Sequence, residues 1–99
     1  MKENKTGLTE GLIGQILDIT RLFPEITGVR LYGSRARGTQ RKYSDVDLAL
    51  FGDFDERVTA EVRGQLEELD TIFEFDVVHF ESLKDEALKK NIEVDGMLL

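Results

Sequence analysis

Apolar residues recur along the first quarter of this chain every three to four positions, which is the spacing of one face of a helix. This pattern predicts an amphipathic helix over residues 9–23, and Pro24 ends it because proline cannot continue a helix. The apolar positions of this helix are Leu12, Ile13, Ile16, Leu17, Ile19, Leu22 and Phe23.

The pattern then changes to short apolar runs bounded by glycine. Residues 29–32 and 45–51 predict two strands. Between them, Ser34 is the expected N-cap of a helical turn at residues 35–37 that Gly38 stops, and the rest of the connection is polar.

Helical spacing returns in the second half of the chain. A helix capped by Asp53 or Asp55 should run to about residue 69, and a buried strand should follow at residues 73–80. Ser82 and Asp85 indicate the start of a last helix through about residue 90. The apolar tail at 94–99 has two interpretations, packing on the core or contact with a partner.

This order of elements, αβαβαβα, predicts one small α/β (α+β-like) domain over residues 1–99. The strand–helix–strand unit of residues 45–80 should be parallel and right-handed. The connection between the first two strands is shorter, so they should be antiparallel. The expected architecture is a mixed three-stranded sheet with helices packed on one face.

Composition narrows the classes of function. The chain has 99 residues and no cysteine, which excludes disulfides and thiolate metal sites. No apolar run approaches the length of a membrane span, and residues 1–5 lack the apolar stretch of a signal peptide, so we expect a cytoplasmic protein without membrane contact. The net charge of −7 disfavours binding of long nucleic acids.

One segment departs from this acidic character. No acidic residue lies between Glu25 and Asp45, and a local cationic stretch of this kind suits a compact anionic ligand. The basic residues of the stretch are Arg30, Arg35, Arg37, Arg41 and Lys42.

Two carboxylates follow the cationic segment directly. Asp45 and Asp47 are two positions apart on a predicted strand, so their side chains should share one face. Two adjacent carboxylates repel one another unless a cation lies between them, and hard oxygen ligands suit Mg²⁺ or Mn²⁺. Asp76 stands between apolar residues of the last strand and can join them if the two strands are parallel neighbours. Three carboxylates can hold two cations, which would clamp the attacking and leaving oxygens of a displacement at phosphorus.

A phosphate-binding turn is predicted at Gly33 and Ser34, where a strand turns into a helical start. Glycine allows the backbone to approach a phosphate closely, and free N–H groups at a helix start favour an anion. Arg35 and Arg37 are nearby cations for the same phosphates.

The segment from Gly33-Ser34 through ten residues to Asp45-Val46-Asp47 resembles the signature of the DNA polymerase β-like nucleotidyltransferase superfamily. Its fuller form looks like the minimal nucleotidyltransferase branch, whose order of elements agrees over almost the whole chain. The matching residues are Gly33, Ser34, Ala36, Arg37, Gly38, Ser44, Asp45, Asp47 and Leu48.

This resemblance implies roles and partners. Metal ligands fall on Asp45, Asp47 and Asp76, with Asp76 as a base for the attacking hydroxyl, and the phosphate-binding pair falls on Gly33 and Ser34. The signature does not fix Arg35, Arg37 or Lys42, which we assign as further phosphate contacts. It also implies an NTP substrate, a small helical HEPN-type toxin, and transfer of AMP from ATP to a tyrosine of that toxin as antitoxin. A hetero-oligomer and a homodimer are both compatible with this role.

Other interpretations stay open at this stage. The chain could neutralise its partner by contact alone, or could be the catalytic subunit of a two-component enzyme that modifies a small molecule or RNA. Asp76 could be a solvent-facing charge or a partner of Arg30, and Arg35 and Arg37 could be a solvated cationic turn. An EF-hand and a Walker P-loop are excluded because their later residues are missing. His79 is expected to be a satisfied, half-buried histidine outside the site.

Overall fold

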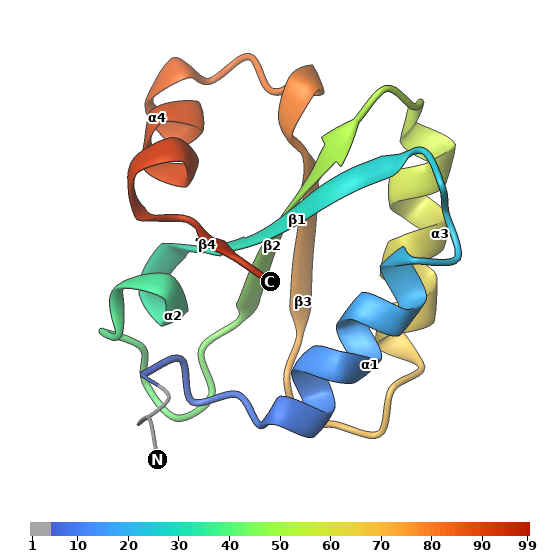
Figure 1. Cartoon of the computed structure of the whole chain (residues 1–99). Coiled ribbons are helices and arrows are strands. Elements are labelled where there is room, and N and C mark those ends of the chain that lie inside the picture. Colours follow the sequence, from blue (N-terminus) through green and yellow to red (C-terminus); the bar gives the residue numbers. More distant parts are fainter. Residues whose placement is uncertain (1–4) are drawn as a thin grey trace.

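The computed structural model describes residues 5–99, and four strands and four α-helices lie within that range. Figure 1 shows their arrangement in space. The same range also contains a short 3-10 helix, η1. In chain order the elements are α1 (Glu10–Thr20), β1 (Ile26–Tyr32), α2 (Gly33–Arg37), β2 (Val46–Gly52), α3 (Glu56–Glu67), β3 (Phe75–His79), η1 (Phe80–Ser82), α4 (Glu86–Asp95) and β4 (Met97–Leu98).

The strands form one mixed sheet in the order β3-β2-β1-β4. As predicted, β1 and β2 are antiparallel, whereas β2 and β3 are parallel. The expectation of three strands is corrected to four, because the apolar tail forms β4 and pairs with Arg30 and Leu31 of β1. A pairing of two residues is too short to be predicted from a strand pattern.

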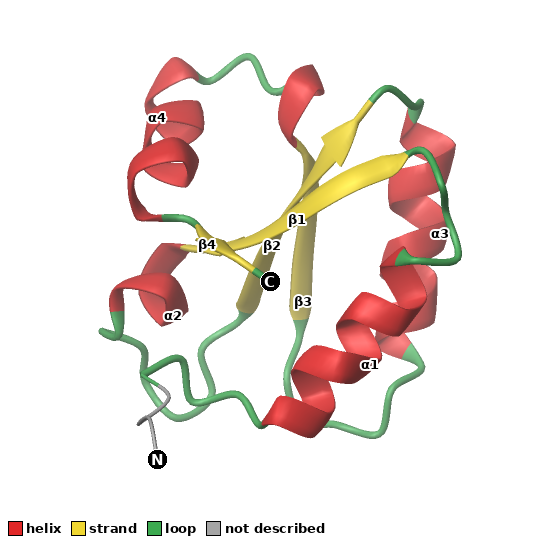
Figure 2. Ribbon diagram, in the orientation of Figure 1, coloured by secondary structure: helices red, strands yellow, loops and turns green. Residues whose placement is uncertain are grey.

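Helices cover both faces of the sheet, so the expectation of helices on one face was wrong. Figures 1 and 2 show α1 and α3 side by side on one face and α4 with α2 on the other. The reason lies in β2, where Ala49 and Phe51 give the second face apolar positions that Ile92 of α4 covers.

The larger core lies between the sheet and the helices α1 and α3. Its side chains alternate along the strands, since successive residues of a strand point to opposite faces. The opposite face of the sheet can therefore carry polar side chains at one of its ends. The main buried members of this core are Leu12, Ile16, Ile19, Val29, Leu31, Val46, Leu48, Leu50, Val62, Leu66 and Val77.

Side-chain caps begin the three longer helices. Thr9 caps α1 by accepting from the Leu12 N–H, and Asp55, one of the two expected residues, caps α3. Asp85 caps α4, which runs to Asp95, five residues beyond the predicted end. Within residues 5–99, no helix has the length and apolar character needed to cross a bilayer. The expectation that residues 1–5 form no signal peptide concerns mainly residues 1–4, which lie outside the described residues.

Candidate active site

The candidate site lies on the sheet face that carries α4, at the end where β1 finishes and where β2 and β3 begin. In the sheet register, Asp47 of β2 is flanked by Tyr32 of β1 and by Asp76 of β3. Paired residues of neighbouring strands project to the same face. The register thus places Asp47 and Asp76 next to each other, and Asp45 precedes β2 by one residue with the parity of Asp47.

These carboxylates act on one another electrostatically. Asp47 is half-buried, and its pKa is raised from 3.8 to about 6, first by burial and then by the nearby charges of Asp76 and Asp45. The guanidinium groups of Arg35 and Arg37 lower the same pKa and offset part of this shift. Burial and the neighbouring carboxylates therefore favour the protonated form of Asp47.

Gly33 brings the predicted phosphate-binding turn against the same carboxylate. Its φ of +73° belongs to the left-handed region, and a Cβ atom built on it would lie 2.5 Å from Asp47 Oδ2. Helix α2 starts at Gly33 rather than after Ser34, so Ser34 is not the N-cap that its position suggested, and no side chain caps the first turn. The Gly33-Ser34 turn and Asp47 thus form one continuous surface.

Replacing Gly33 with alanine should cost stability and transfer activity together. We expect a loss of about 1–2 kcal/mol, because alanine resists the positive φ and its methyl group collides with Asp47. Thermal unfolding checks this against Gly64→Ala. Gly64 lies inside α3 with open space around it, so its replacement should stabilise by about 0.5–1 kcal/mol. Equal effects of the two substitutions would contradict the close approach.

Arg35 was predicted to contact phosphate, but the structure buries it. Its side chain is only 1 % exposed. The guanidinium donates to the Thr6 carbonyl at 2.7 Å and to the Ser44 carbonyl at 2.9 and 3.1 Å, and it lies 4.4 Å above the ring of Phe73. Through these hydrogen bonds Arg35 stabilises the loop before Asp45, which argues against a direct phosphate contact.

The other two predicted phosphate contacts are solvent-accessible. Arg37 lies 3.9 Å from Asp95 of α4 and is close enough to Asp47 to lower its pKa. Lys42 lies on the exposed loop, with its ammonium nitrogen 5.4 Å from the centre of the Tyr43 ring. The structure thus brings Arg37 toward the carboxylates, whereas Lys42 stays with its own loop.

Sequence reasoning did not single out Tyr32, the register neighbour of Asp47. Tyr32 is buried, and its pKa is raised by burial and by the charges of Asp76 and Asp47. Its place directly before Gly33, at the end of a predicted strand, was the available signal. It forms one wall of the candidate site.

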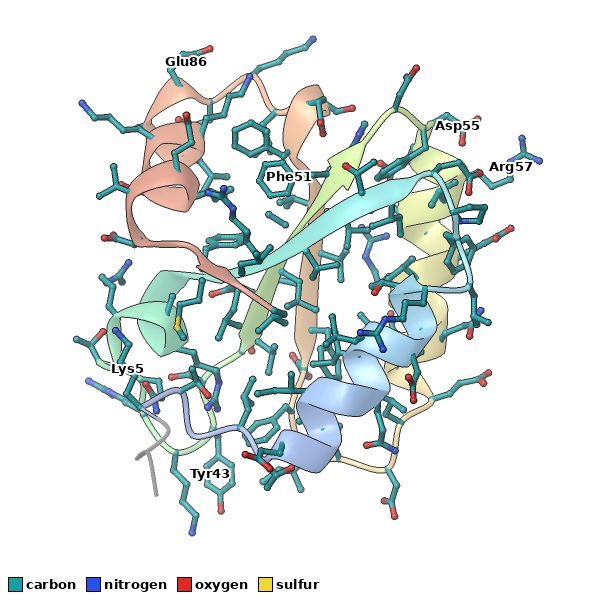
Figure 3. All side chains as sticks on the ribbon, in the orientation of Figure 1. Lys5, Tyr43, Phe51, Asp55, Arg57 and Glu86 are labelled. Atoms are coloured by element: carbon teal, nitrogen blue, oxygen red, sulfur yellow. The ribbon has the colours of Figure 1, made fainter. Side chains whose placement is uncertain are left out.

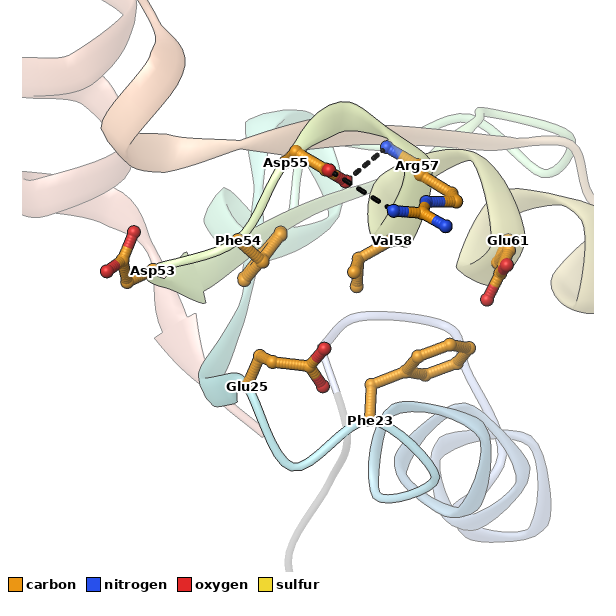
Figure 4. Close-up of a pocket in the computed structure, with 8 residues that line it drawn as sticks. All are labelled: Phe23, Glu25, Asp53, Phe54, Asp55, Arg57, Val58 and Glu61. Carbon is orange, nitrogen blue, oxygen red and sulfur yellow. Dashed lines mark hydrogen bonds and ion pairs between the residues drawn. The ribbon is translucent and has the colours of Figure 1, made fainter.

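The opposite end of the sheet holds none of these residues. Here His79 is buried, and its ring nitrogens lie 2.7 Å from the Gly52 carbonyl and from Ser82 Oγ, so the expectation of a satisfied histidine is confirmed. A pocket of about 410 Å³ also lies at this end, and Figure 4 shows the apolar and acidic side chains around it. The lining residues are Phe23, Glu25, Asp53, Phe54, Asp55, Arg57, Val58 and Glu61.

A comparison with family models decides which family this arrangement represents. The model described as "Polymerase beta, Nucleotidyltransferase" matches residues 14–99, which include Gly33, Ser34 and all three aspartates. The chain belongs to this nucleotidyltransferase family. The mixed sheet, the glycine-serine turn and the paired aspartates of the site are therefore parts of a polymerase β-like nucleotidyltransferase domain.

Solved structures with this nucleotidyltransferase fold include toxin–antitoxin proteins. A tyrosine-to-alanine mutant of the toxin–antitoxin MntA-HpeT is 27% identical, with a TM-score of 0.72, and the match covers 93% of this chain and 72% of that one. A toxin–antitoxin structure with AMP-PNP is 26% identical, with a TM-score of 0.70. The match covers 92% of this chain and 72% of that chain.

A nucleotidyltransferase structure from Sulfolobus solfataricus shows the same fold at lower similarity. It is 18% identical, with a TM-score of 0.59, and the match covers 99% of this chain and 87% of that chain. No curated protein matches the chain by sequence.

Proposed function

We propose that this protein is a Mg²⁺-dependent nucleotidyltransferase that transfers AMP from ATP to a hydroxyl group, a tyrosine of a HEPN-type toxin, and acts as its antitoxin. One observation carries the proposal. Asp47 and Asp76 are register neighbours on the face that also carries the Gly33 turn, in a chain of the nucleotidyltransferase family. The likeness to toxin–antitoxin structures, one of them with AMP-PNP, supports the choice of partner and nucleotide.

The carboxylates fit a divalent magnesium or manganese ion. Among residues 5–99, no three His, Cys, Asp or Glu side chains converge into a complete metal cage. Mg²⁺ does not need one, since it is commonly held by one or two carboxylates together with substrate phosphates and water. The pKa of Asp47 is raised by burial and by the charges of Asp76 and Asp45, and a bound cation would relieve this repulsion. Asp45, Asp47 and Asp76 would hold the ions, which when bound neutralise charge on the phosphates.

Each residue of the site would then have its own role in the reaction. The acceptor hydroxyl oxygen bonds to the α-phosphorus of ATP, the bond from that phosphorus to the bridging oxygen breaks, and pyrophosphate leaves. Asp76 is exposed at the start of β3, where its carboxylate can accept the proton of the hydroxyl. The Gly33-Ser34 turn holds the departing phosphates, and Arg37 adds a positive charge beside Asp47.

Mass spectrometry of a co-purified HEPN-type partner, after incubation with this chain, ATP and Mg²⁺, tests the proposal. We expect a mass gain of whole AMP units on a tyrosine, and no gain with the Asp45→Asn variant. A tight complex without any gain would instead support neutralisation by contact alone. A gain that persists in the variant would refute the assigned site.

A further inference from the structure

Among residues 5–99, no strand pairs with the outer edge of β3, which leaves backbone groups unpaired directly beside Asp76. β3 is the last strand of the sheet on its side. The Glu74 carbonyl points toward β2, where it accepts from the Val46 N–H at 2.9 Å, and the Val77 carbonyl points outward, where it accepts from Arg63 Nη2 at 3.1 Å. Because backbone groups alternate along a strand, the N–H and C=O of Phe75 also point outward.

A pocket opens at the same edge. It has a volume of about 430 Å³ and is lined by Glu67, at the end of α3, and by Phe73, Glu74 and Phe75. No residue of β1 or β2 takes part in this lining, so the pocket lies on the outer side of β3. Both glutamates are exposed, and two aromatic rings accompany them. An acidic pocket with aromatic walls suits the stem and the charge of a lysine or arginine side chain.

We propose that an extended acceptor segment of the protein partner pairs with the outer edge of β3 and places a lysine or arginine in this pocket. This inference rests on the proposed function, since it assumes a protein acceptor. Main-chain pairing with an exposed edge supplies affinity, and pockets for alternate side chains supply specificity. The occupant is basic because Glu67 and Glu74 are the charged groups of the pocket.

The alternation of side chains fixes the spacing. In a strand paired with β3, a hydroxyl side chain opposite Asp76 would share the face of the candidate site, where Asp47 also lies. Its immediate neighbour in the segment would point to the opposite face, the side on which Phe75 projects. The basic residue should therefore stand directly next to the acceptor tyrosine.

Arg63 limits where this pairing can occur. Its bond to the Val77 carbonyl occupies the outer edge in the middle of β3, as expected of a side chain that protects an edge strand. Phe75, beside Asp76, keeps both of its outward groups. The docking edge is thus restricted to the end of β3 that carries the candidate base.

NMR titration of the ¹⁵N-labelled chain with two short peptides tests the inference. The peptides differ only at the positions beside a central tyrosine, Lys-Tyr-Lys in one and Glu-Tyr-Glu in the other. We expect the lysine peptide to shift the Phe75 amide and to bind up to about fivefold more tightly, given up to about 1 kcal/mol for an exposed ion pair. Shifts confined to another surface, equal affinities, or no binding would overturn the inference.

A pair of charge reversals provides the matched control. Glu67→Lys with Glu74→Lys should remove or invert the preference between the peptides. Glu61→Lys with Glu93→Lys changes the net charge equally at exposed helical positions away from the pocket, so it should preserve the preference. Loss of the preference in both doubles would reduce the effect to overall charge and refute the pocket.

The peptide titration is independent of transfer, so the two proposals can fail separately. AMP transfer to the partner without a β3-edge response would reject the docking edge and keep the proposed function. Binding at the β3 edge without transfer to any partner would keep this edge as a contact site for a basic segment, but would reject the enzyme and the role of that segment as acceptor.

Discussion

The Asp47→Asn variant should lose nucleotidyl transfer and gain thermal stability in the absence of metal. Transfer should fall by about 10²–10³-fold, the size of effect found when one group that stabilises a transition state is removed. The gain in stability follows from the raised pKa of Asp47, about 6 in the folded protein against an ordinary 3.8. Such a carboxyl contributes most to stability when protonated, below pH 3.8, and this contribution is lost as the pH rises through 6.

Thermal unfolding at two pH values with EDTA checks this prediction. At pH 8 we expect the variant to be more stable by about 1 kcal/mol, allowing for the solvent screening of a half-exposed group, or roughly 5 °C in Tm. At pH 4 the difference should shrink, because Asp47 is then largely protonated in the wild type. Asp45→Asn is the control, since Asp45 is exposed and should give loss of transfer with a smaller gain. A variant that is less stable than wild type at pH 8 would contradict the prediction.

Replacing Arg35 with methionine should destabilise the protein by about 3 kcal/mol, which corresponds to roughly 15 °C in Tm. Methionine fills much of the volume but donates no hydrogen bonds, so the Thr6 and Ser44 carbonyls would lose the partners that Arg35 supplies. The stacking on Phe73 would also lose its cation. Chemical denaturation of the purified variant measures the loss directly.

Arg37→Met separates this structural role from phosphate binding. Arg37 is half-exposed and makes one long ion pair, so its replacement should change stability by less than about 0.5 kcal/mol and should raise the KM for the nucleotide. The opposite pattern, a stable Arg35→Met protein with a raised KM and an Arg37→Met protein with normal kinetics, would restore Arg35 as the phosphate contact.

Local sequence patterns predicted the parts of the fold that depend on neighbouring residues. The strand that carries Asp47 was predicted because apolar residues alternate with it, and the shared face of Asp47 and Asp76 followed from parallel strands. The cap of α3 at Asp55 also needed only adjacent residues, whereas the cap of α4 is Asp85 and not Ser82, where the predicted signal began. Contacts between residues close in sequence produce a periodic pattern of apolar positions, and this pattern can be recognised in a single sequence.

The features that were missed depend on contacts between distant segments. Arg35 lies in the polar, cationic segment that suggested phosphate binding, yet its partners Thr6 and Phe73 are far away along the chain. Likewise, β4 exists because Met97 reaches back to Leu31, and a two-residue strand has no period. In the same way, α4 packs on the second face of the sheet because it contacts apolar residues of β2, which are distant in the sequence.

The basic loop before Asp45 lies beside acidic groups, and this has a consequence for the speed of encounter with the nucleotide. Figure 3 shows Lys5 and Tyr43 at the lower end of the molecule and Asp55 at the upper end. The basic loop of Arg41 and Lys42 belongs to the lower end, whereas the acidic pocket of Figure 4 belongs to the upper one. At the lower end the basic loop attracts a polyphosphate, while the carboxylates of the site and the net charge of −7 repel it, so both effects on its association rate should weaken as ionic strength rises.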